Sequence, residues 1–131
     1  GPIHRDPYPL ALLEVCLADE AHRSDALLVV YAHPLADREL RARHREGLDR
    51  EVMMEPGQPY LFDIDLSATA LEFAAGHRIR IAITSSQFPA RERNMNTGGV
   101  NNEETSGIVA HNTILHERDH PSHIVLPVME Q

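Results

Sequence analysis

The sequence predicts an all-β fold, a sandwich or barrel of short strands, and two observations carry this prediction. Turn-forming prolines and glycines recur at short intervals along the 131 residues. Between them, hydrophobic residues alternate with polar ones at the period of two that marks a half-buried strand. The hydrophobic content of 42% is enough for a core, and the length fits a single domain covering residues 1–131.

Seven segments have strand character. In chain order they are residues 10–17, 26–32, 40–44, 60–66, 78–85, 108–116 and 123–128. In the last of these, "SHIVLPV", Pro127 indicates an edge strand or a bulge, because proline donates no hydrogen bond to a neighbouring strand.

Two of these strands alternate clearly enough to predict which side chains are buried. In "PYLFDIDL", Phe62 and Ile64 share one face, and aspartates occupy the other. In "GHRIRIAITSS", Ile81 and Ile83 fall on the inner face and arginines on the outer one. We expect these four apolar side chains to be almost fully buried.

The segment "ADRELRARHREG" is ambiguous. Its residues favour a helix, with Asp37 as a cap, but such a helix would have almost no apolar stripe to bury. Interpreted as a strand, it places Leu40, Ala42 and His44 on one face and arginines on the other. We therefore predict a strand here.

Composition excludes several classes of partner. A formal net charge of −8 disfavours binding to nucleic acid or to an anionic membrane, and no run is long enough to span a membrane. All twelve cationic residues are arginines, which rules out lysine-based chemistry.

Cys16 lies in an apolar stretch, where we expect it to be buried. As the only cysteine it forms no intrachain disulfide, which indicates a reducing, cytoplasmic location.

No catalytic motif is present. Ser85 and Ser86 end a predicted strand, but the sequence has no G-x-S-x-G turn and no glycine-rich oxyanion loop. The simpler interpretation is that these serines satisfy backbone groups where the strand turns. We therefore assign no catalytic residue.

No metal or cofactor site is assigned either. The histidines of "HNTILHERDHPSH" do not have the spacing of a zinc site, so we interpret them as solvated or turn residues. Oxygen-bearing side chains that suit Ca²⁺ gather between residues 94 and 104, but the cluster lacks the D-x-D-x-D-G pattern and also suits a turn. Its members are Asn94, Asn96, Asn101, Asn102, Glu103 and Glu104.

Arginines mark a candidate contact surface. Arg41, Arg43 and Arg45 share the outward face of one predicted strand, and Arg78 and Arg80 that of another. They are either a solvated face balanced by nearby carboxylates, or a polar interface of the kind in which arginine is enriched.

Four motifs together resemble a known family. "LRARHREGLDREVMMEPGQPY", "FAAGHRIRIAITSSQFP", "RNMNTGG" and "HPSHIVLPV" occur in this order, within residues 32–129. They are similar to the C-terminal domain of serine hydrolases of the X-Pro dipeptidyl-peptidase type, the group of cocaine esterase, glutaryl acylases and α-amino-acid ester hydrolases. The resemblance implies a jelly-roll β-sandwich that is galactose-binding-domain-like.

The resemblance also implies a role. In that family the catalytic triad lies in a preceding α/β-hydrolase domain, and the C-terminal domain is non-catalytic, packs on that domain and helps wall the active site. No residue of this sequence corresponds to the triad. Any catalytic activity would therefore depend on residues of a separate hydrolase domain. The implied partner is the hydrolase domain. The candidate contact residues are Arg41, Arg43, Arg78, Arg80, Phe88, Asn94 and Asn96.

Residues 1–25 fit the family poorly, whereas residues 26–131 form the family-like core. We therefore expect a shortened N-terminal strand, an exposed sheet edge and pairing of that edge with a second copy. The alternative function is a stand-alone carbohydrate- or ligand-binding module, although the chain has no Trp and only three Tyr and three Phe for stacking on sugars.

Overall fold

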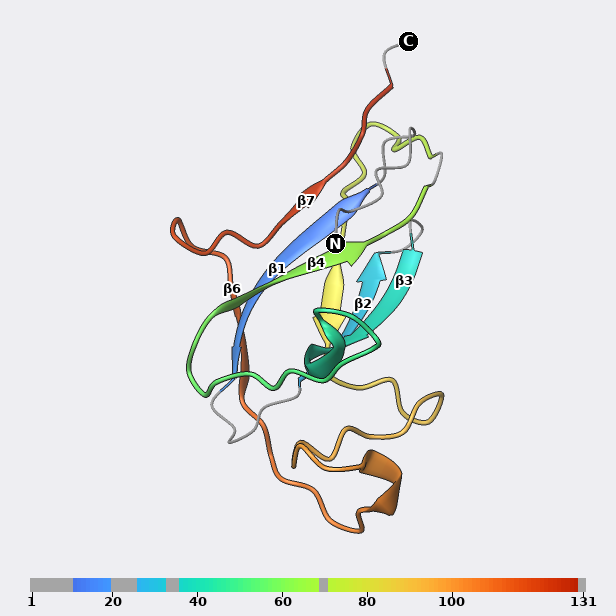
Figure 1. The fold of residues 1–131 in the computed structure, drawn as a ribbon. Coiled ribbons are helices and arrows are strands. Elements are labelled where there is room, and N and C mark those ends of the chain that lie inside the picture. Colours follow the sequence, from blue (N-terminus) through green and yellow to red (C-terminus); the bar gives the residue numbers. More distant parts are fainter. Residues whose placement is uncertain (1–10, 20–25, 33–35, 69–70, 130–131) are drawn as a thin grey trace.

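Two antiparallel sheets pack against each other in the computed structural model of this chain (Figure 1). The structure describes residues 11–19, 26–32, 36–68 and 71–129. One sheet has the strand order β4-β1-β6, with β7 also paired to β1, and the other has the order β3-β2-β5. The predicted all-β sandwich is confirmed. Its closer likeness to galactose-binding domains stays a prediction.

The strands are short, as expected. They are β1 (Leu12–Asp19), β2 (Leu27–Ala32), β3 (Ala36–Arg41), β4 (Tyr60–Asp65), β5 (Ala82–Thr84), β6 (Asn112–Leu115) and β7 (His123–Val125). Two 3₁₀ turns join them, η1 (Ala42–His44) and η2 (Asn101–Glu103). Within the described ranges, no helix approaches the length and apolar character of a membrane span.

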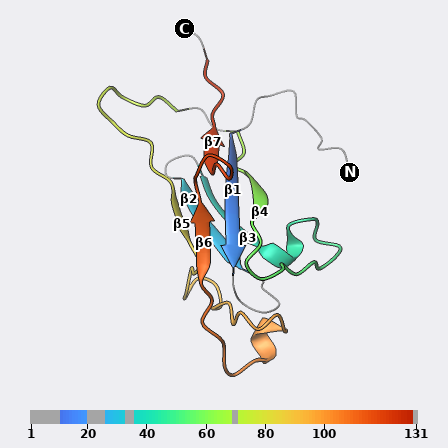
Figure 2. The ribbon, with the colours of Figure 1, turned by 90° about the vertical axis from the view of Figure 1, so that its left-hand side faces the viewer.

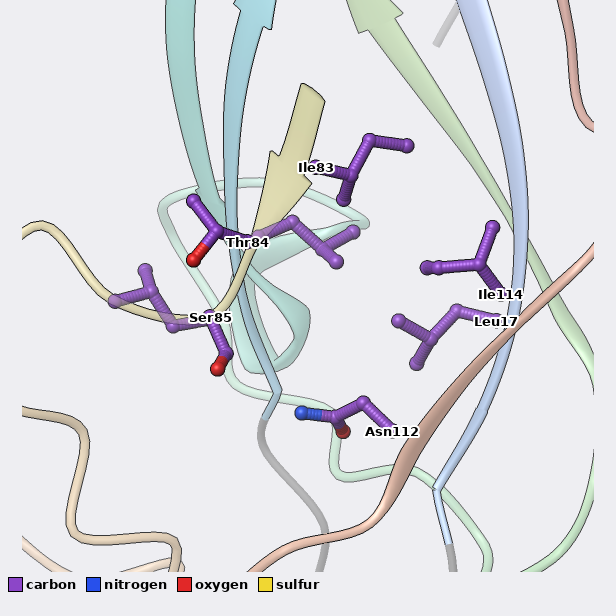
Figure 3. A pocket seen from close by; sticks show the side chains of 8 residues that line it. Leu17, Ile83, Thr84, Ser85, Asn112 and Ile114 are labelled. Atoms are coloured by element: carbon purple, nitrogen blue, oxygen red, sulfur yellow. The ribbon is translucent and has the colours of Figure 1, made fainter. Parts of the chain in front are cut away.

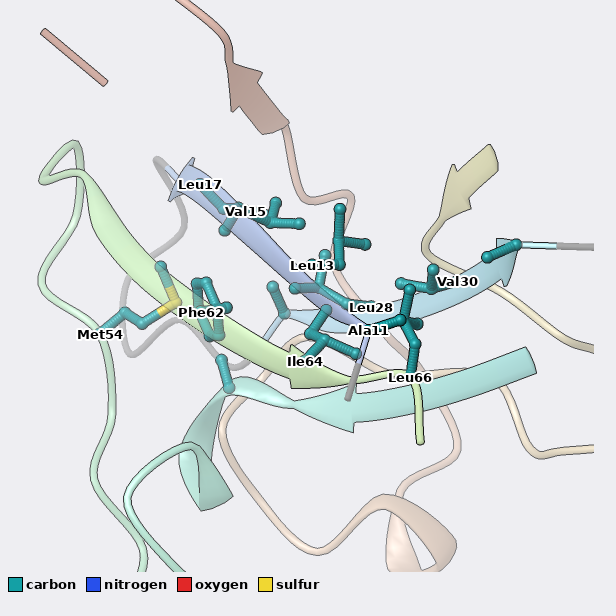
Figure 4. Packing of buried hydrophobic residues seen from close by; sticks show 13 residues of the cluster. Ala11, Leu13, Val15, Leu17, Leu28, Val30, Met54, Phe62, Ile64 and Leu66 are labelled. Carbon is teal, nitrogen blue, oxygen red and sulfur yellow. The ribbon is translucent and has the colours of Figure 1, made fainter. Parts of the chain in front are cut away.

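The core lies between the two sheets and draws on β1, β2 and β4 (Figure 4). Phe62 and Ile64 of β4 are 1% and 5% exposed, and the intervening Asp63 is exposed, so the predicted alternation in this strand is confirmed. Cys16 is buried as predicted. Burial, together with the nearby charge of Glu14, raises the pKa of its thiol, so the thiol stays protonated at neutral pH.

The N-terminal part of the chain supplies the central strand of the larger sheet. β1 has eight residues and pairs with β4 on one side and with β6 and β7 on the other. The expectation that this region contains a shortened strand at an exposed edge is therefore wrong for residues 12–19. Residues 1–10 and 20–25 lie outside the described part of the chain.

A serine bridges the gap between β6 and β7 along β1. The chain leaves the sheet after Leu115, which is paired with Cys16, and returns at His123, which is paired with Glu14, so the ladder along β1 has a gap between these two pairs. Ser122 fills this place: its Oγ accepts from the Cys16 N–H at 2.9 Å and donates to the carbonyl oxygen of Leu115. A side chain thus takes the role of a backbone hydrogen bond.

The strand predicted at residues 40–44 begins earlier and ends earlier. β3 stops at Arg41, and η1 follows. Because a 3₁₀ turn rotates successive side chains by about 120° instead of reversing them, Ala42 and Arg43 both become buried. The outward orientation predicted for Arg43 is therefore wrong: this side chain is only 5% exposed.

The later strands are also shorter than predicted. In the segment 78–85 only β5, three residues long, is paired, and 108–116 and 123–128 likewise contract to four and three residues. Ile81 and Ile83 face the core but are only partly buried, so the prediction of nearly full burial is wrong for them. Edge position alone does not explain this difference, because β4 is also an edge strand; Ile83, however, lines a hollow between β5 and β6, so the opposite sheet does not cover it closely.

Candidate functional site

Two arginines at the end of β3 hold the long connection between β5 and β6. Arg41 donates from Nη2 to Asn94 Oδ1 at 3.1 Å, and Arg43 donates from Nη2 to the carbonyl oxygen of Gly99 at 2.9 Å. The Nη1 atom of Arg43 lies 3.4 Å from Glu51 Oε1. Since a guanidinium group has five donors in a fixed plane, one side chain joins two segments that lie far apart in the sequence.

The loop from residue 94 to residue 108, here called the braced loop, is closed by its own hydrogen bonds. Met95 N–H donates to Asn101 Oδ1 at 2.7 Å, and Ile108 N–H donates to the carbonyl oxygen of Met95 at 2.9 Å. Asn96 Nδ2 donates to the carbonyl oxygen of Ile108 at 3.0 Å. A Cβ on Gly107 would lie 2.9 Å from that oxygen of Met95, so this closure requires glycine.

The same contacts bear on the calcium hypothesis. Asn94 Nδ2 donates to Asn96 Oδ1, and the Oγ1 of Thr97 donates to the carboxylate of Glu104. Four of the six side chains in the cluster therefore already accept hydrogen bonds through their oxygens, and Asn94 Oδ1 accepts one from a guanidinium group. This arrangement favours the interpretation of the cluster as a structured turn.

Large apolar side chains are exposed on and beside the braced loop, which lies at one end of the sandwich (Figure 1, orange). The side chain of Arg93 lies over the Phe88 ring, 4.6 Å from its centroid, yet Phe88 remains 57% exposed. We call the following residues the loop surface: Phe88, Val100, Ile108 and Val109. The sequence predicted Phe88, Asn94 and Asn96 as contact residues. The two asparagines instead form hydrogen bonds that fix the braced loop.

Arg78 and Arg80 belong to a different part of the molecule. They precede β5, whereas the braced loop follows it, and both side chains are exposed. The structure therefore divides the predicted contact residues into a group that organises the braced loop and a pair beside the start of β5.

Of the two serines that follow β5, Ser86 makes structural contacts, whereas Ser85 lines a hollow between β5 and β6. Ser86 N–H donates to Thr84 Oγ1 at 3.4 Å, and Ser86 Oγ accepts from Phe88 N–H at 3.2 Å. These are the backbone contacts expected where a strand turns, and they give Ser86 Oγ no base to activate it.

Two histidines of the C-terminal quarter contact different carboxylates. His120 pairs with Glu117 at 2.9 Å, and His123 Nε2 pairs with Glu14 Oε2 across β7 and β1 at 2.9 Å. In the part of the chain that the structure describes, no three His, Cys, Asp or Glu side chains come close enough to hold a metal ion.

The surface has two hollows that the sequence did not predict. One, of about 450 Å³, lies between the end of β3 and the braced loop and is lined by apolar and charged side chains, among them Leu40, Arg41, Arg91 and Asn94. The other, of about 220 Å³, lies between β5 and β6. Each joins segments distant in the sequence, so no local pattern marks it.

Comparison with known proteins places this arrangement in a family. The family model of the X-Pro dipeptidyl-peptidase C-terminal non-catalytic domain matches residues 21–125. The cocaine esterase of Rhodococcus sp. (strain MB1 Bresler) is 42% identical over 99 residues, which are 74% of this chain and 17% of that protein. The chain thus spans about a sixth of the length of this relative, and it belongs to the family of X-Pro dipeptidyl-peptidase C-terminal non-catalytic domains.

Proposed function

We propose that this chain is the accessory β-sandwich domain of a serine hydrolase that cleaves ester or amide bonds, and that it packs against a catalytic α/β-hydrolase domain. The single observation that carries the proposal is the family match over residues 21–125, supported by a relative that is itself an esterase and extends far beyond the matched region. The domain contributes stability and part of the active-site wall, and the chemistry lies elsewhere. The expected setting is the cytoplasm.

The loop surface is the part best suited to contact the catalytic domain. Its apolar side chains are exposed, as expected of an interface whose partner is absent. The braced loop that carries Val100 and Ile108 is fixed by Arg41 and Arg43, so docking would order few additional groups. A preorganised surface of this kind binds at a smaller entropic cost than a flexible one.

The alternative, a carbohydrate-binding module, has weaker support. The larger hollow offers carboxylates, guanidinium groups and carboxamides that suit sugar hydroxyls, but no Phe, Tyr or Trp lines it. Sugar-binding surfaces commonly stack an aromatic ring on the sugar face, and this hollow has no such platform.

A chimera tests the proposed function. The 99 matched residues of the Rhodococcus esterase are replaced by their counterparts from this chain, and ester hydrolysis and thermal inactivation are compared with the parent and with an enzyme lacking the segment. We expect the chimera to keep activity and to outlast the shortened enzyme on heating. The isolated chain should hydrolyse p-nitrophenyl esters no faster than buffer.

Variants of the chimera test the contact surface. Val109→Asp and Phe88→Asp introduce a charge into the loop surface and should make the chimera inactivate sooner. Leu71→Asp is the matched control, because Leu71 is 44% exposed and lines neither the loop surface nor the two hollows. A chimera as unstable as the shortened enzyme, or turnover by the isolated chain, would contradict the accessory role.

A further inference from the structure

The two long sides of the sandwich are closed differently. Figure 2 shows β3 and β4 along one side and β5 and β6 along the other. On the first side the sheets are joined, because Arg38 of β3 donates from Nε to the carbonyl oxygen of Asp65 in β4 at 3.1 Å. On the second side, the smaller hollow separates β5 from β6.

β5 has a free edge and a sequence that suits a longer strand. It pairs with β2 through three residue pairs, and no other described strand lies along its outer side. The alternation of apolar and polar residues extends back to Arg78, yet Ile79 is 47% exposed and unpaired. Such an edge offers backbone donors and acceptors to an incoming strand.

The hollow beside this edge is lined by both apolar and polar side chains and contains an unsatisfied acceptor. Leu17 and Ile114 point across it toward Ile83 (Figure 3). Asn112 lines its other end, and the Oδ1 of Asn112 is buried without a hydrogen-bond partner among the described residues. A buried acceptor without a donor is unfavourable, and a backbone N–H of an added segment would supply that donor.

The charge beside the edge defines the partner further. Arg78 and Arg80 fall on the outward face of the β5 segment, opposite Ile81 and Ile83, and both are exposed. No described carboxylate forms an ion pair with either of them, although the chain carries a net charge of −8. Acidic residues at alternate positions of an added strand would pair with these two arginines.

We infer that the free edge of β5 binds an extended peptide segment of a partner protein by strand addition. The segment alternates apolar residues, which enter the hollow beside Ile83, with acidic residues, which face Arg78 and Arg80. Paired backbones give affinity in this mode, and alternate side chains give specificity. A second copy of the chain fits this edge less well, since antiparallel pairing of two β5 segments places the arginines of both copies on one face.

The test uses the full chain and a labelled probe peptide, acetyl-Ser-Asp-Val-Asp-Val-Asp-Val-Ser-amide. Binding is followed by fluorescence anisotropy, and hydrogen exchange reports on the amides of residues 79–85. We expect saturable binding with new protection of these amides. Two matched peptides serve as controls, one with lysine in place of every aspartate and one with proline in place of the central valine. Both control peptides should bind at least about tenfold more weakly than the probe, which means a Kd at least about ten times higher.

Variants of the chain complete the test. The double variant R78E/R80E should lose about tenfold in affinity, whereas R50E/R118E, with the same change of charge at other exposed arginines, should not. Asn112→Leu should raise the thermal midpoint of the free chain and also weaken peptide binding, which a purely structural asparagine would not do. Equal binding of the lysine peptide, or no effect of R78E/R80E, would overturn the inference.

Two further outcomes also overturn it. Light scattering that shows a dimer, with residues 79–85 protected in the absence of peptide, would assign the edge to a second copy. Absence of binding by the full chain would reject strand addition but leave the accessory-domain proposal intact, because the chimera tests that proposal independently.

Discussion

The first and second halves of this domain use their apolar residues in opposite ways. Among the described residues, all sixteen buried hydrophobic side chains lie between residues 11 and 66. Ten of the twelve exposed large hydrophobic side chains lie between residues 71 and 129. The first half therefore buries its own hydrophobic residues, whereas the second half wraps around it and leaves many of its own uncovered.

This difference shows how one domain combines a stable core with exposed apolar surface. The fully buried core draws mainly on β1, β2 and β4, and the later segments add only partly buried side chains such as Ile83 and Ile114, so much of the second half is free to present apolar surface. It stays ordered through polar contacts instead, above all the hydrogen bonds of Arg41 and Arg43 to the braced loop. Stability and exposed surface are thus assigned to different parts of one chain.

The largest expected effect is the loss of a core aromatic ring from the first half. Phe62→Ala should reduce the free energy of unfolding by about 3–5 kcal/mol, because it leaves a cavity between the sheets. Phe88→Ala in the second half removes the same ring from an exposed position and should cost about 0.5 kcal/mol or less. Urea unfolding measures both. Equal losses would show that the second half belongs to the core.

The next effect concerns the contact that joins the halves. Arg43→Ala removes the donor to Gly99 and the partner of Glu51, and it should cost about 2–3 kcal/mol, as expected for hydrogen bonds to a charged group. Hydrogen exchange should also show the amides of residues 94–108 losing protection. Arg91→Ala is the control, since its pair with Glu39 is exposed and such pairs contribute about 0–1 kcal/mol. An unchanged braced loop in Arg43→Ala would mean that the halves are held together in another way.

A smaller effect is expected where the second half attaches to β1. Ser122→Ala leaves the Cys16 N–H without an acceptor, which should cost about 1–3 kcal/mol. Ser86→Ala, which removes an exposed turn contact, should change stability by about 0.5 kcal/mol or less. Thermal unfolding of the two variants compares them directly. If Ser122→Ala unfolds like the wild type, water must replace the lost hydroxyl.

The same contrast explains what could be predicted from the sequence. In β4 the alternation of Phe62 and Ile64 with aspartates predicted burial correctly, because the opposite sheet covers the inner face of this strand. For Ile81 and Ile83 an equally clear pattern predicted too much burial, since alternation says which side faces inward and not what covers it. The identity of the family followed from four motifs, and the family match agrees with it.

The parts of the site that escaped prediction depend on contacts distant in the sequence. Arg43 becomes buried because the strand gives way to a 3₁₀ turn, and its partners lie eight and fifty-six residues further along the chain. Ser122 lies 106 residues from the strand that it completes. No local pattern marks such partners, and a hydrogen bond of this kind is fixed only when the sheets have assembled.

The smallest expected effect uses Cys16 to test how well the first half excludes water. Burial first, and the charge of Glu14 second, raise the pKa of this thiol above its ordinary value of 9.0. Below that value both the folded and the unfolded states keep the proton, so the full stability is present. Above it the unfolded state ionises first, and the free energy of unfolding falls as the pH rises toward the pKa of the folded state. Cys16→Ala should show a shallower alkaline decline than the wild type in urea unfolding, and this difference isolates the contribution of the thiol. Parallel declines in the two proteins would mean that the thiol ionises as readily in the folded state as in the unfolded one, and that water reaches the centre of β1.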